Sequence, residues 1–331
     1  MKKMLAWLLS ILMVCSLAAC GNEKEQTVEE PITVVLDWTP NTNHTGIFVA
    51  QTKGYFEEAG LQVEVVQPPE DGAVALVASG KAQFGVSFQD SLAPAFVGDA
   101  PMPVTAVAAV IQHNTSGIIS RAGEGMDTPK GLEGKKYATW DLDVEKATIR
   151  DVMEADGGDF EQVELIPSTV TDEVSALQSG SVDAIWVYYG WAGMACQVAG
   201  LATDYFAFAD IDPVFDYYTP VIIGGNDWLE AYPETAKAFL AALAKGYTYA
   251  AQQPKEAADI LMDAAPELKT NEELVYASQE YLAGEYIADA ARWGEFDGER
   301  WAGFFNWLNE NQLLEEKIDP GFGFTNEYLP D

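Results

Sequence analysis

Short apolar runs alternate with amphipathic stretches along much of the chain. The runs predict strands at residues 32–36, 61–66, 84–87, 104–110, 136–139, 163–166 and 184–187. The stretches between them have helical spacing, as at 45–53, where Gly54 follows as the expected terminator. Strands that alternate with helices favour a mostly parallel sheet with helices on both faces, so the pattern predicts an α/β fold.

One segment of this pattern occurs twice. Residues 75–86 and 176–186 each combine an amphipathic helix, a Ser-Gly pair, a short link and a buried strand. We interpret the match as one α/β unit used in each of two similar lobes. The chain would leave the first lobe near Ser116 and return near Thr219, and two crossings indicate a hinge with a cleft. The predicted division is 32–116 with 220–331 for the first lobe and 117–219 for the second.

The C-terminal third has a different pattern. Apolar positions at helical spacing predict helices at 234–251, 254–265, 271–283 and 299–311, with Pro, Gly and Asn at the breaks. Its aromatic residues, including Trp293, Trp301 and Trp307, are interpreted as packing residues. We therefore expect no chemistry from this part of the chain.

The N-terminus has the pattern of an export signal. Two lysines precede the apolar run 5–19, which fits a signal peptide but is short for a membrane span. The run ends Leu17-Ala18-Ala19-Cys20-Gly21, which resembles the bacterial lipobox, where cleavage before the cysteine is coupled to its lipidation. We predict a signal peptide over 1–19, a lipidated Cys20 and a polar tether over 20–31, anchored to the extracytoplasmic face of the cell membrane. An ordinary secretory signal with a chance cysteine is the alternative.

Charge and residue counts narrow the possible partners. A net charge of −34 at pH 7 disfavours nucleic acid and anionic lipid, which such a surface would repel. The alternative is that an acidic surface only aids solubility. Three cysteines and two histidines support neither a disulfide framework nor a zinc cluster, so no metal or cofactor is predicted. We expect a monomer.

Polar and aromatic residues gather where the predicted strands end. In open α/β sheets, ligands bind beyond the carboxyl ends of the strands. The candidate ligand-binding residues at these ends are Asp37, Trp38, Asn41, Asn43, His44, Gln89, Asp90, Gln112, His113, Trp140, Asp141, Trp186, Tyr188, Tyr189 and Trp191. Aromatic rings, amides and carboxylates dominate this set, and together they predict a binding cleft.

Basic residues are missing from these strand ends. No Lys or Arg occurs in 32–44, 85–97, 111–120 or 186–194. A sulfonate, phosphate or nitrate site would usually supply a cation, although helix N-termini alone can hold anions. The set therefore suits a flat, neutral or weakly basic heterocycle, with Trp and Tyr stacked on its faces and a carboxylate or amide at its edge.

Several candidates have a structural alternative. Trp38 and Trp186 could be core residues, and His113 could hold the predicted hinge. Asp90 and Asp141 could cap the helices that follow them. The convergence of all candidates on one edge, rather than any single residue, indicates the cleft.

Catalysis has little support in the sequence. The chain lacks the Gly-x-Ser-x-Gly elbow, a phosphate-binding loop with lysine and the His-Glu-x-x-His motif, so we predict that it is not an enzyme. Asp37 and His44 could form a proton-transfer pair, but the sequence does not fix their geometry. The loop 41–43 between them could serve turn geometry only.

Six motifs taken together resemble one known family. They are Leu36-Asp37-Trp38-Thr39-Pro40-Asn41-Thr42-Asn43-His44-Thr45-Gly46, Gly54-Tyr55-Phe56, Gln67-Pro68-Pro69-Glu70-Asp71-Gly72, Gln112-His113-Asn114-Thr115-Ser116-Gly117, Tyr189-Gly190-Trp191 and Asp216-Tyr217-Tyr218-Thr219-Pro220. The chain resembles the substrate-binding lipoproteins of ABC importers for thiamine-pyrimidine precursors, in a superfamily that includes hydroxymethylpyrimidine phosphate synthases. The resemblance implies a two-lobed periplasmic-binding-protein fold of the second type, a formylaminopyrimidine-like ligand and a permease partner. It adds Tyr218 to the candidate residues.

The ligand itself stays open. Phe88-Gln89-Asp90-Ser91 and Trp140-Asp141-Leu142-Asp143 depart from the family pattern at the predicted pocket. Related binders recognise riboflavin or other flat heterocycles, and a pyrimidine phosphate synthase-like enzyme or an extracellular sensor are further alternatives. We predict that Trp38 and at least one of Trp186, Tyr188 and Tyr189 sandwich the ring from opposite lobes. The edge of the ring would be bound by Asp37, Asn43, Gln89, Asp90 or His113.

Overall fold

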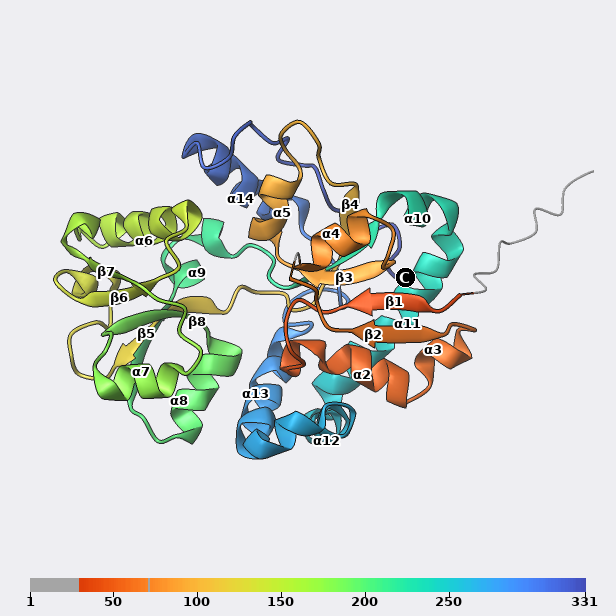
Figure 1. The fold of residues 1–331 in the computed structure, drawn as a ribbon, viewed down its shortest axis with the longest axis horizontal. Coiled ribbons are helices and arrows are strands. Elements are labelled where there is room, and N and C mark those ends of the chain that lie inside the picture. The colour runs from red at the N-terminus through yellow and green to blue at the C-terminus, as the bar shows by residue number, and fades with distance from the viewer. Residues whose placement is uncertain (1–29, 71) are drawn as a thin grey trace, which may run out of the picture.

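The computed structural model describes residues 30–70 and 72–331. The predicted signal peptide, Cys20 and most of the predicted tether lie outside the described residues. Two five-stranded sheets, each surrounded by helices, lie side by side and are joined by the chain crossings between them (Figure 1). The expected α/β architecture is confirmed.

The first sheet has the strand order β2-β1-β3-β10-β4. Its strands are β1 (Ile32–Val35), β2 (Val63–Val66), β3 (Phe84–Ser87), β4 (Val104–Ala109) and β10 (Val221–Gly225). β1 pairs in parallel with β2 and β3, whereas β10 pairs antiparallel with β3 and β4. β10 is the strand with which the chain returns from the second sheet, and it runs against its neighbours.

The second sheet repeats this arrangement with the order β7-β6-β8-β5-β9. Its strands are β5 (Ser116–Arg121), β6 (Lys136–Thr139), β7 (Glu164–Pro167), β8 (Ala184–Tyr188) and β9 (Thr203–Ala207). β6 pairs in parallel with β7 and β8, and β5 pairs antiparallel with β8 and β9. Four of the five strands in each sheet run in the same direction, so the sheets are mostly parallel as expected. One crossing strand in each sheet, β10 in the first and β5 in the second, runs in the opposite direction.

The internal repeat occupies equivalent places in the two sheets. The helix α4 (Gly72–Ala78) leads into β3, and α7 (Glu173–Ser179) leads into β8. Gly80 and Gly180 end these helices with φ angles of +73° and +67°, a left-handed conformation that favours glycine. β3 and β8 are the third strands of their sheets, so their carboxyl ends are related positions.

The remaining helices cover the sheets and the crossings between them. They are α2 (Thr45–Thr52), α3 (Tyr55–Glu58), α5 (Gln89–Ala95), α6 (Asp143–Ala155), α8 (Met194–Val198), α9 (Phe208–Ile211), α10 (Asn226–Ala231), α11 (Pro233–Gln252), α12 (Pro254–Ala264), α13 (Glu272–Glu285) and α14 (Gly298–Glu310). The four helices predicted in the C-terminal third are all present, with ends that differ by at most two residues.

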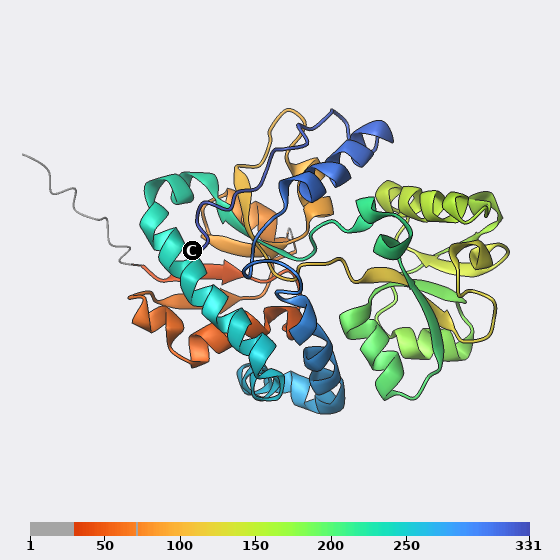
Figure 2. The same ribbon diagram turned by 180° about the vertical axis from the view of Figure 1, so that it is seen from behind.

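Two of these C-terminal helices reach across the gap between the sheets. α13 packs against α8 and the π-helical turn η4 (Tyr189–Gly193), and α14 lies on the other side of the crossings, near α6 (Figures 1 and 2). The indole of Trp307 in α14 donates to Asp151 Oδ2 in α6 at 2.6 Å. The relative position of the sheets therefore depends on the C-terminal helices as well as on the crossings.

The packing of α2 against α11 requires a glycine. A Cβ at Gly46 would overlap the ring of Tyr247. That ring is fixed, because its hydroxyl donates to the carbonyl of Asn43 at 2.7 Å and its face stacks on Trp293 at 4.6 Å. The contact places the loop after β1 against the α11 surface.

We predict that Gly46→Ala lowers the free energy of unfolding by about 1–3 kcal/mol, the usual range for overpacking a core. Urea denaturation measures the change. Gly303→Ala is the control, because a Cβ there meets nothing within 4 Å and α14 gains a better helix former. Equal stability of the two variants would contradict the close-packing account.

Candidate functional site

The carboxyl ends of β3 and β8 meet between the two sheets. Phe88 follows β3, and its ring centroid lies 6.4 Å from that of Tyr188, the last residue of β8, at an interplanar angle of 17°. Burial raises the pKa of the Tyr188 phenol, and the nearby charges of Asp90 and Asp37 raise it further. Side chains from the ends of β1, β3 and β8 therefore share one neighbourhood.

Asp90 has an unsatisfied oxygen in this neighbourhood. Its Oδ1 is shielded from solvent and has no hydrogen-bond partner within the described part of the chain. Burial raises the pKa of this carboxyl to about 6, although the backbone N–H groups of Ser91 and of Asp90 itself oppose the shift. The N-cap of α5 is Phe88 and not Asp90, so the capping alternative does not explain the carboxylate.

The loop after β1 orients Asp37. His44 is fully buried, and its Nδ1 accepts the backbone N–H of Asn41 at 3.1 Å. Nε2 therefore carries the ring hydrogen of the neutral imidazole and donates to Asp37 Oδ1 at 2.6 Å. Asn41 Oδ1 accepts the N–H of Asn43 at 2.9 Å, which is the turn role considered for this loop. The loop thus fixes the Asp37–His44 geometry that the sequence left open.

Three of the four candidate tryptophans, Trp38, Trp140 and Trp186, differ widely in exposure. Trp38 is 65% exposed and Trp140 41%, whereas Trp186 is 6% exposed. Trp186 packs on Phe208 at 4.3 Å, and Trp140 leans on Trp186 at 5.9 Å. Trp186 is thus a core residue, which agrees with the structural alternative given for it from the sequence. Its Nε1 has no hydrogen-bond partner among the described residues. Trp38 and Trp140 are the rings that remain accessible.

Tyr189 and Trp191 face a different element. Tyr189 packs on Tyr205 at 4.4 Å and on Tyr281 of α13 at 5.5 Å. Trp191 is half-buried in the cluster that α11, α12 and α13 form with the first sheet. These two aromatics therefore connect η4 to α13 and stand apart from the Phe88–Tyr188 pair.

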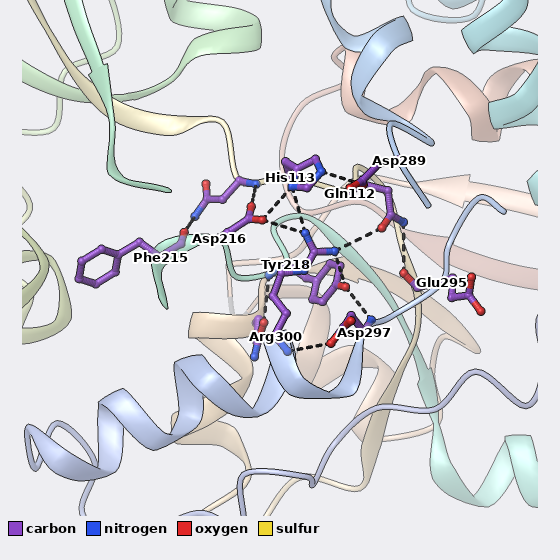
Figure 3. A network of polar contacts seen from close by, with 11 residues as sticks. Gln112, His113, Phe215, Asp216, Tyr218, Asp289, Glu295, Asp297 and Arg300 are labelled. Carbon is purple, nitrogen blue, oxygen red and sulfur yellow. Dashed lines mark hydrogen bonds and ion pairs between the residues drawn. The ribbon is translucent and has the colours of Figure 1, made fainter. Parts of the chain in front are cut away.

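Gln89 and Gln112 are engaged by the protein itself. Gln89 is fully buried, its Nε2 donates to the carbonyl of Trp301 at 2.8 Å, and its Oε1 accepts the N–H of Tyr218 at 2.9 Å. Gln112 donates to the carbonyl of Glu295 at 3.2 Å (Figure 3). Both amides hold the crossing segments against the region around α14.

A charged network ties the crossings together around Asp216 (Figure 3). Asp216 Oδ2 bonds His113 Nδ1 at 2.8 Å and accepts from Arg300 of α14 at 2.9 Å. Arg300 also donates to the hydroxyl of Tyr218, and His113 Nε2 lies 3.0 Å from Asp289 Oδ1. Burial opposes protonation of His113, but the two carboxylates prevail and raise its pKa above the ordinary value.

The origin of Arg300 corrects one expectation. We expected no chemistry from the C-terminal third, yet α14 supplies a cation to His113 and Asp216. The contact could not be predicted from a local sequence pattern, because Arg300 is separated from His113 by 187 positions. Phe88 was expected at the end of the strand that stops near Ser87 but was not chosen as a ligand-binding residue, and the structure places its ring beside Tyr188.

A cavity of about 360 Å³ lies beside the crossings, on the side of α13. His113 is the only candidate ligand residue in its wall. The wall also includes the carboxylates of Asp210, Asp216 and Glu285 and the ring of Tyr281. This cavity is thus separate from the neighbourhood of Asp90 and Tyr188.

The described residues contain neither a cluster of metal-ligating side chains nor a membrane-spanning helix. Within 30–70 and 72–331, no three or more His, Cys, Asp or Glu side chains gather as metal ligands would. Over the same ranges, no helix has the length and hydropathy of a membrane span.

Comparison with known proteins gives a family and a fold. A family model described as NMT1/THI5 like matches residues 41–257. The formylaminopyrimidine-binding protein of Halalkalibacterium halodurans is 31% identical over 325 residues, which cover 96% of each chain. A 4-amino-5-hydroxymethyl-2-methylpyrimidine phosphate synthase of Saccharomyces cerevisiae is 27% identical over 274 residues, 75% of this chain and 74% of the synthase.

The solved structures establish the architecture. The periplasmic aliphatic sulphonate binding protein of Escherichia coli superposes with a TM-score of 0.68 at 15% identity, covering 88% of this chain and 91% of that protein. The predicted two-lobed periplasmic-binding-protein fold of the second type is confirmed. Because the family model spans more than half of the chain and a binding protein matches it along nearly its whole length, the chain belongs to the NMT1/THI5-like family.

Proposed function

We propose that this protein is the extracytoplasmic solute-binding component of an ABC importer and that it binds a thiamine-pyrimidine precursor of the formylaminopyrimidine type. The relative that covers 96% of both chains is a formylaminopyrimidine-binding protein. The fold is that of proteins that enclose small ligands between two lobes. The observation that carries the proposal is the unpartnered Oδ1 of Asp90 beside the Phe88–Tyr188 pair.

An aminopyrimidine supplies what this neighbourhood lacks. Its exocyclic amino group is a hydrogen-bond donor, and Asp90 Oδ1 is a shielded acceptor without a donor among the described residues. A planar ring also packs favourably on aromatic faces, which Phe88 and Tyr188 supply. Trp38 and Trp140, which follow β1 and β6, have exposed rings that could add further faces. The ligand would therefore satisfy both the edge and the faces of the site.

The electrostatics argue against an anionic ligand. Asp90 and Asp37 both act on Tyr188, so the neighbourhood is negative. Arg300 is committed to Asp216 and Tyr218 at the crossings. Sulphonate binding by the Escherichia coli protein therefore bears on the shared fold and not on the ligand of this chain.

A binding role is favoured over a synthase role. The binding protein is 31% identical over 96% of this chain, whereas a synthase of Legionella pneumophila that covers 92% of this chain is only 22% identical. His44 is buried and holds Asn41 and Asp37 through its two ring nitrogens, which gives the imidazole a structural role. We propose no catalytic step.

We predict that the purified protein binds formylaminopyrimidine more tightly than riboflavin. A site that offers one carboxylate edge between aromatic faces suits a single pyrimidine ring. Isothermal titration calorimetry with both compounds and with hydroxymethylpyrimidine measures the preference. Mass spectrometry of ligand released on denaturation identifies any compound that the protein retains. Tighter binding of riboflavin would contradict the proposed pyrimidine ligand and would indicate a component of a flavin importer.

We predict that Asp90→Asn weakens formylaminopyrimidine binding at pH 7.5 by about 10–100-fold, the usual worth of a hydrogen bond to a charged group. Wild-type affinity falls as pH drops below about 6, where Asp90 becomes protonated. The affinity of the variant does not change over that interval. Calorimetry at pH 5 to 8 measures both trends, with the exposed loop residue Asp99→Asn as control.

The same substitution has a stability effect of opposite sign. The folded-state pKa of Asp90 is raised to about 6, so the folded protein loses stability as pH rises towards 6. We therefore expect Asp90→Asn to unfold with a free energy higher than wild type above pH 6, by on the order of 1–3 kcal/mol. The gain shrinks as pH falls from 6 towards 4. A variant that lost both affinity and stability would indicate misfolding and contradict the site assignment.

We propose that the mature protein is held at the membrane by lipidated Cys20. The support is the Leu-Ala-Ala-Cys-Gly sequence after a short apolar run. We predict that Cys20→Ser moves the protein from the membrane fraction to the soluble fraction of its native host, as immunoblotting would show. Cys196→Ser is the control, since that buried thiol has no anchoring role. Membrane retention of Cys20→Ser at the parent level would refute the anchor.

A further inference from the structure

The segment 140–142, between β6 and α6, exposes two large apolar side chains. Trp140 is 41% exposed and Leu142 is 58% exposed. Asp141 between them has a φ of +66°, a left-handed conformation that is unfavourable for residues other than glycine. Burial of these side chains therefore does not explain why the segment adopts this backbone.

Hydrogen bonds that one carboxyl group accepts explain the backbone of this segment. Glu145 lies in the first turn of α6 and is 3% exposed. Its Oε1 accepts the N–H of Trp140 at 3.1 Å, and its Oε2 accepts the N–H of Leu142 at 3.3 Å. The N–H of Asp141 donates to Thr139 Oγ1 at 2.9 Å, and that hydroxyl donates to Glu145 Oε2 at 3.0 Å. Glu145 thus fixes all three backbone N–H groups, one of them through Thr139.

This set of contacts is larger than a helix cap needs. A first-turn acid of a capping box usually bonds one backbone N–H. Glu145 also accepts the hydroxyl of fully buried Tyr137 at 2.6 Å. Burial and the Glu145 charge raise the pKa of that phenol well above its ordinary value, so Tyr137 stays a donor. The carboxyl group is matched to donors on both oxygens.

The ring of Trp140 is also supported from behind. It leans on Trp186 at 5.9 Å, and Trp186 packs on Phe208 at 4.3 Å. β6 runs parallel to β8, so Trp140 after β6 and Tyr188 at the end of β8 lie at the same edge of the sheet. The hydrogen-bonded backbone and the packing on Trp186 together hold the Trp140 ring in one place. That place is the sheet edge at which we propose that the ligand binds.

We propose that Glu145 is a positioning residue for ligand binding, which holds segment 140–142 so that Trp140 is preorganised as a contact for the heterocycle. The inference rests on the proposed function, since Trp140 is assigned to the ligand. Ordering of the segment occurs on folding and not on binding, so the ordering entropy does not reduce the affinity. Without Glu145, only a fraction of molecules would have the competent segment, and the apparent affinity would fall by that fraction.

Glu145→Gln tests the proposal in the full-length protein. Glutamine keeps one acceptor oxygen and places an NH₂ group against donors, so the segment loses part of its support. We expect hydrogen exchange at the amides of 140–142 to accelerate at least tenfold. We expect the association rate for formylaminopyrimidine, measured by stopped-flow tryptophan fluorescence, to fall about tenfold while the dissociation rate stays within twofold. A merely structural loss of contact would raise the dissociation rate instead.

A matched variant separates positioning from general damage. Thr148→Val removes a hydrogen bond of 2.9 Å from Thr148 Oγ1 to the carbonyl of Val144 in the same helix, without touching segment 140–142. It is expected to leave exchange at 140–142 and both rate constants unchanged. Equal effects of the two variants would overturn the proposal, as would unchanged exchange or an unchanged association rate in Glu145→Gln.

Two other results are possible: Glu145→Gln does not fold, or the wild type binds none of the tested compounds. If Glu145→Gln does not fold, Thr139→Val replaces it, because this change removes only the hydroxyl that links Asp141 to Glu145. The same rate and exchange criteria then apply. If the wild type binds none of the pyrimidines or flavins, the proposed function fails and the ligand role of Glu145 fails with it. Wild-type binding with an insensitive Glu145→Gln would refute the positioning role alone.

Discussion

The position of the two lobes relative to one another depends on the carboxylate of Asp216. It lies on the returning crossing, and it bonds the N–H of Asn114 at 2.8 Å and the ring of His113 at 2.8 Å on the outgoing crossing. Arg300 brings α14 to the same carboxylate. Charge-assisted bonds of this kind are strong and directional. The two crossings and α14 are thus held together at one point, and a closure of the lobes around a ligand would have to move around it.

The repeated α/β unit was predictable, whereas the crossing strands were not. Residues 75–86 and 176–186 carry the same helix, turn and strand signals, and they form the same part of each sheet. β5, β9 and β10 were not predicted. β5 and β10 follow the crossings and break the alternation of strand and helix, and β9 is the edge strand that pairs with β5. Val221–Gly225 ends in two glycines, and it is stabilised as a strand by pairing with β3 and β4 on either side. Such pairing is long-range, and local propensity does not report it.

The neighbourhood of the candidate site was predictable at the level of strand ends and not at the level of single side chains. The rule for open sheets identified Asp90 and Tyr188, whose neighbourhood the structure describes. Gln89 and Asp90 are adjacent in sequence, but the Gln89 side chain is hydrogen-bonded to two backbone groups. Asp90 has an oxygen with no partner among the described residues. Consecutive residues of a helix point in directions about 100° apart, and only the packed structure decides which one faces the lobe interface.

The carboxyl groups of Glu145 and Asp90 differ in how far the protein satisfies their hydrogen bonds. Glu145 is buried and receives donors on both oxygens, so this fold can satisfy a buried carboxyl where the structure requires it. Asp90 is left with a shielded oxygen and a raised pKa, which costs folding free energy. Local costs of this kind are held in place by the surrounding structure and cluster at functional sites. In the function that we propose, the ligand donates the hydrogen bond that Asp90 Oδ1 lacks among the described residues, and Glu145 positions segment 140–142 for the same ligand.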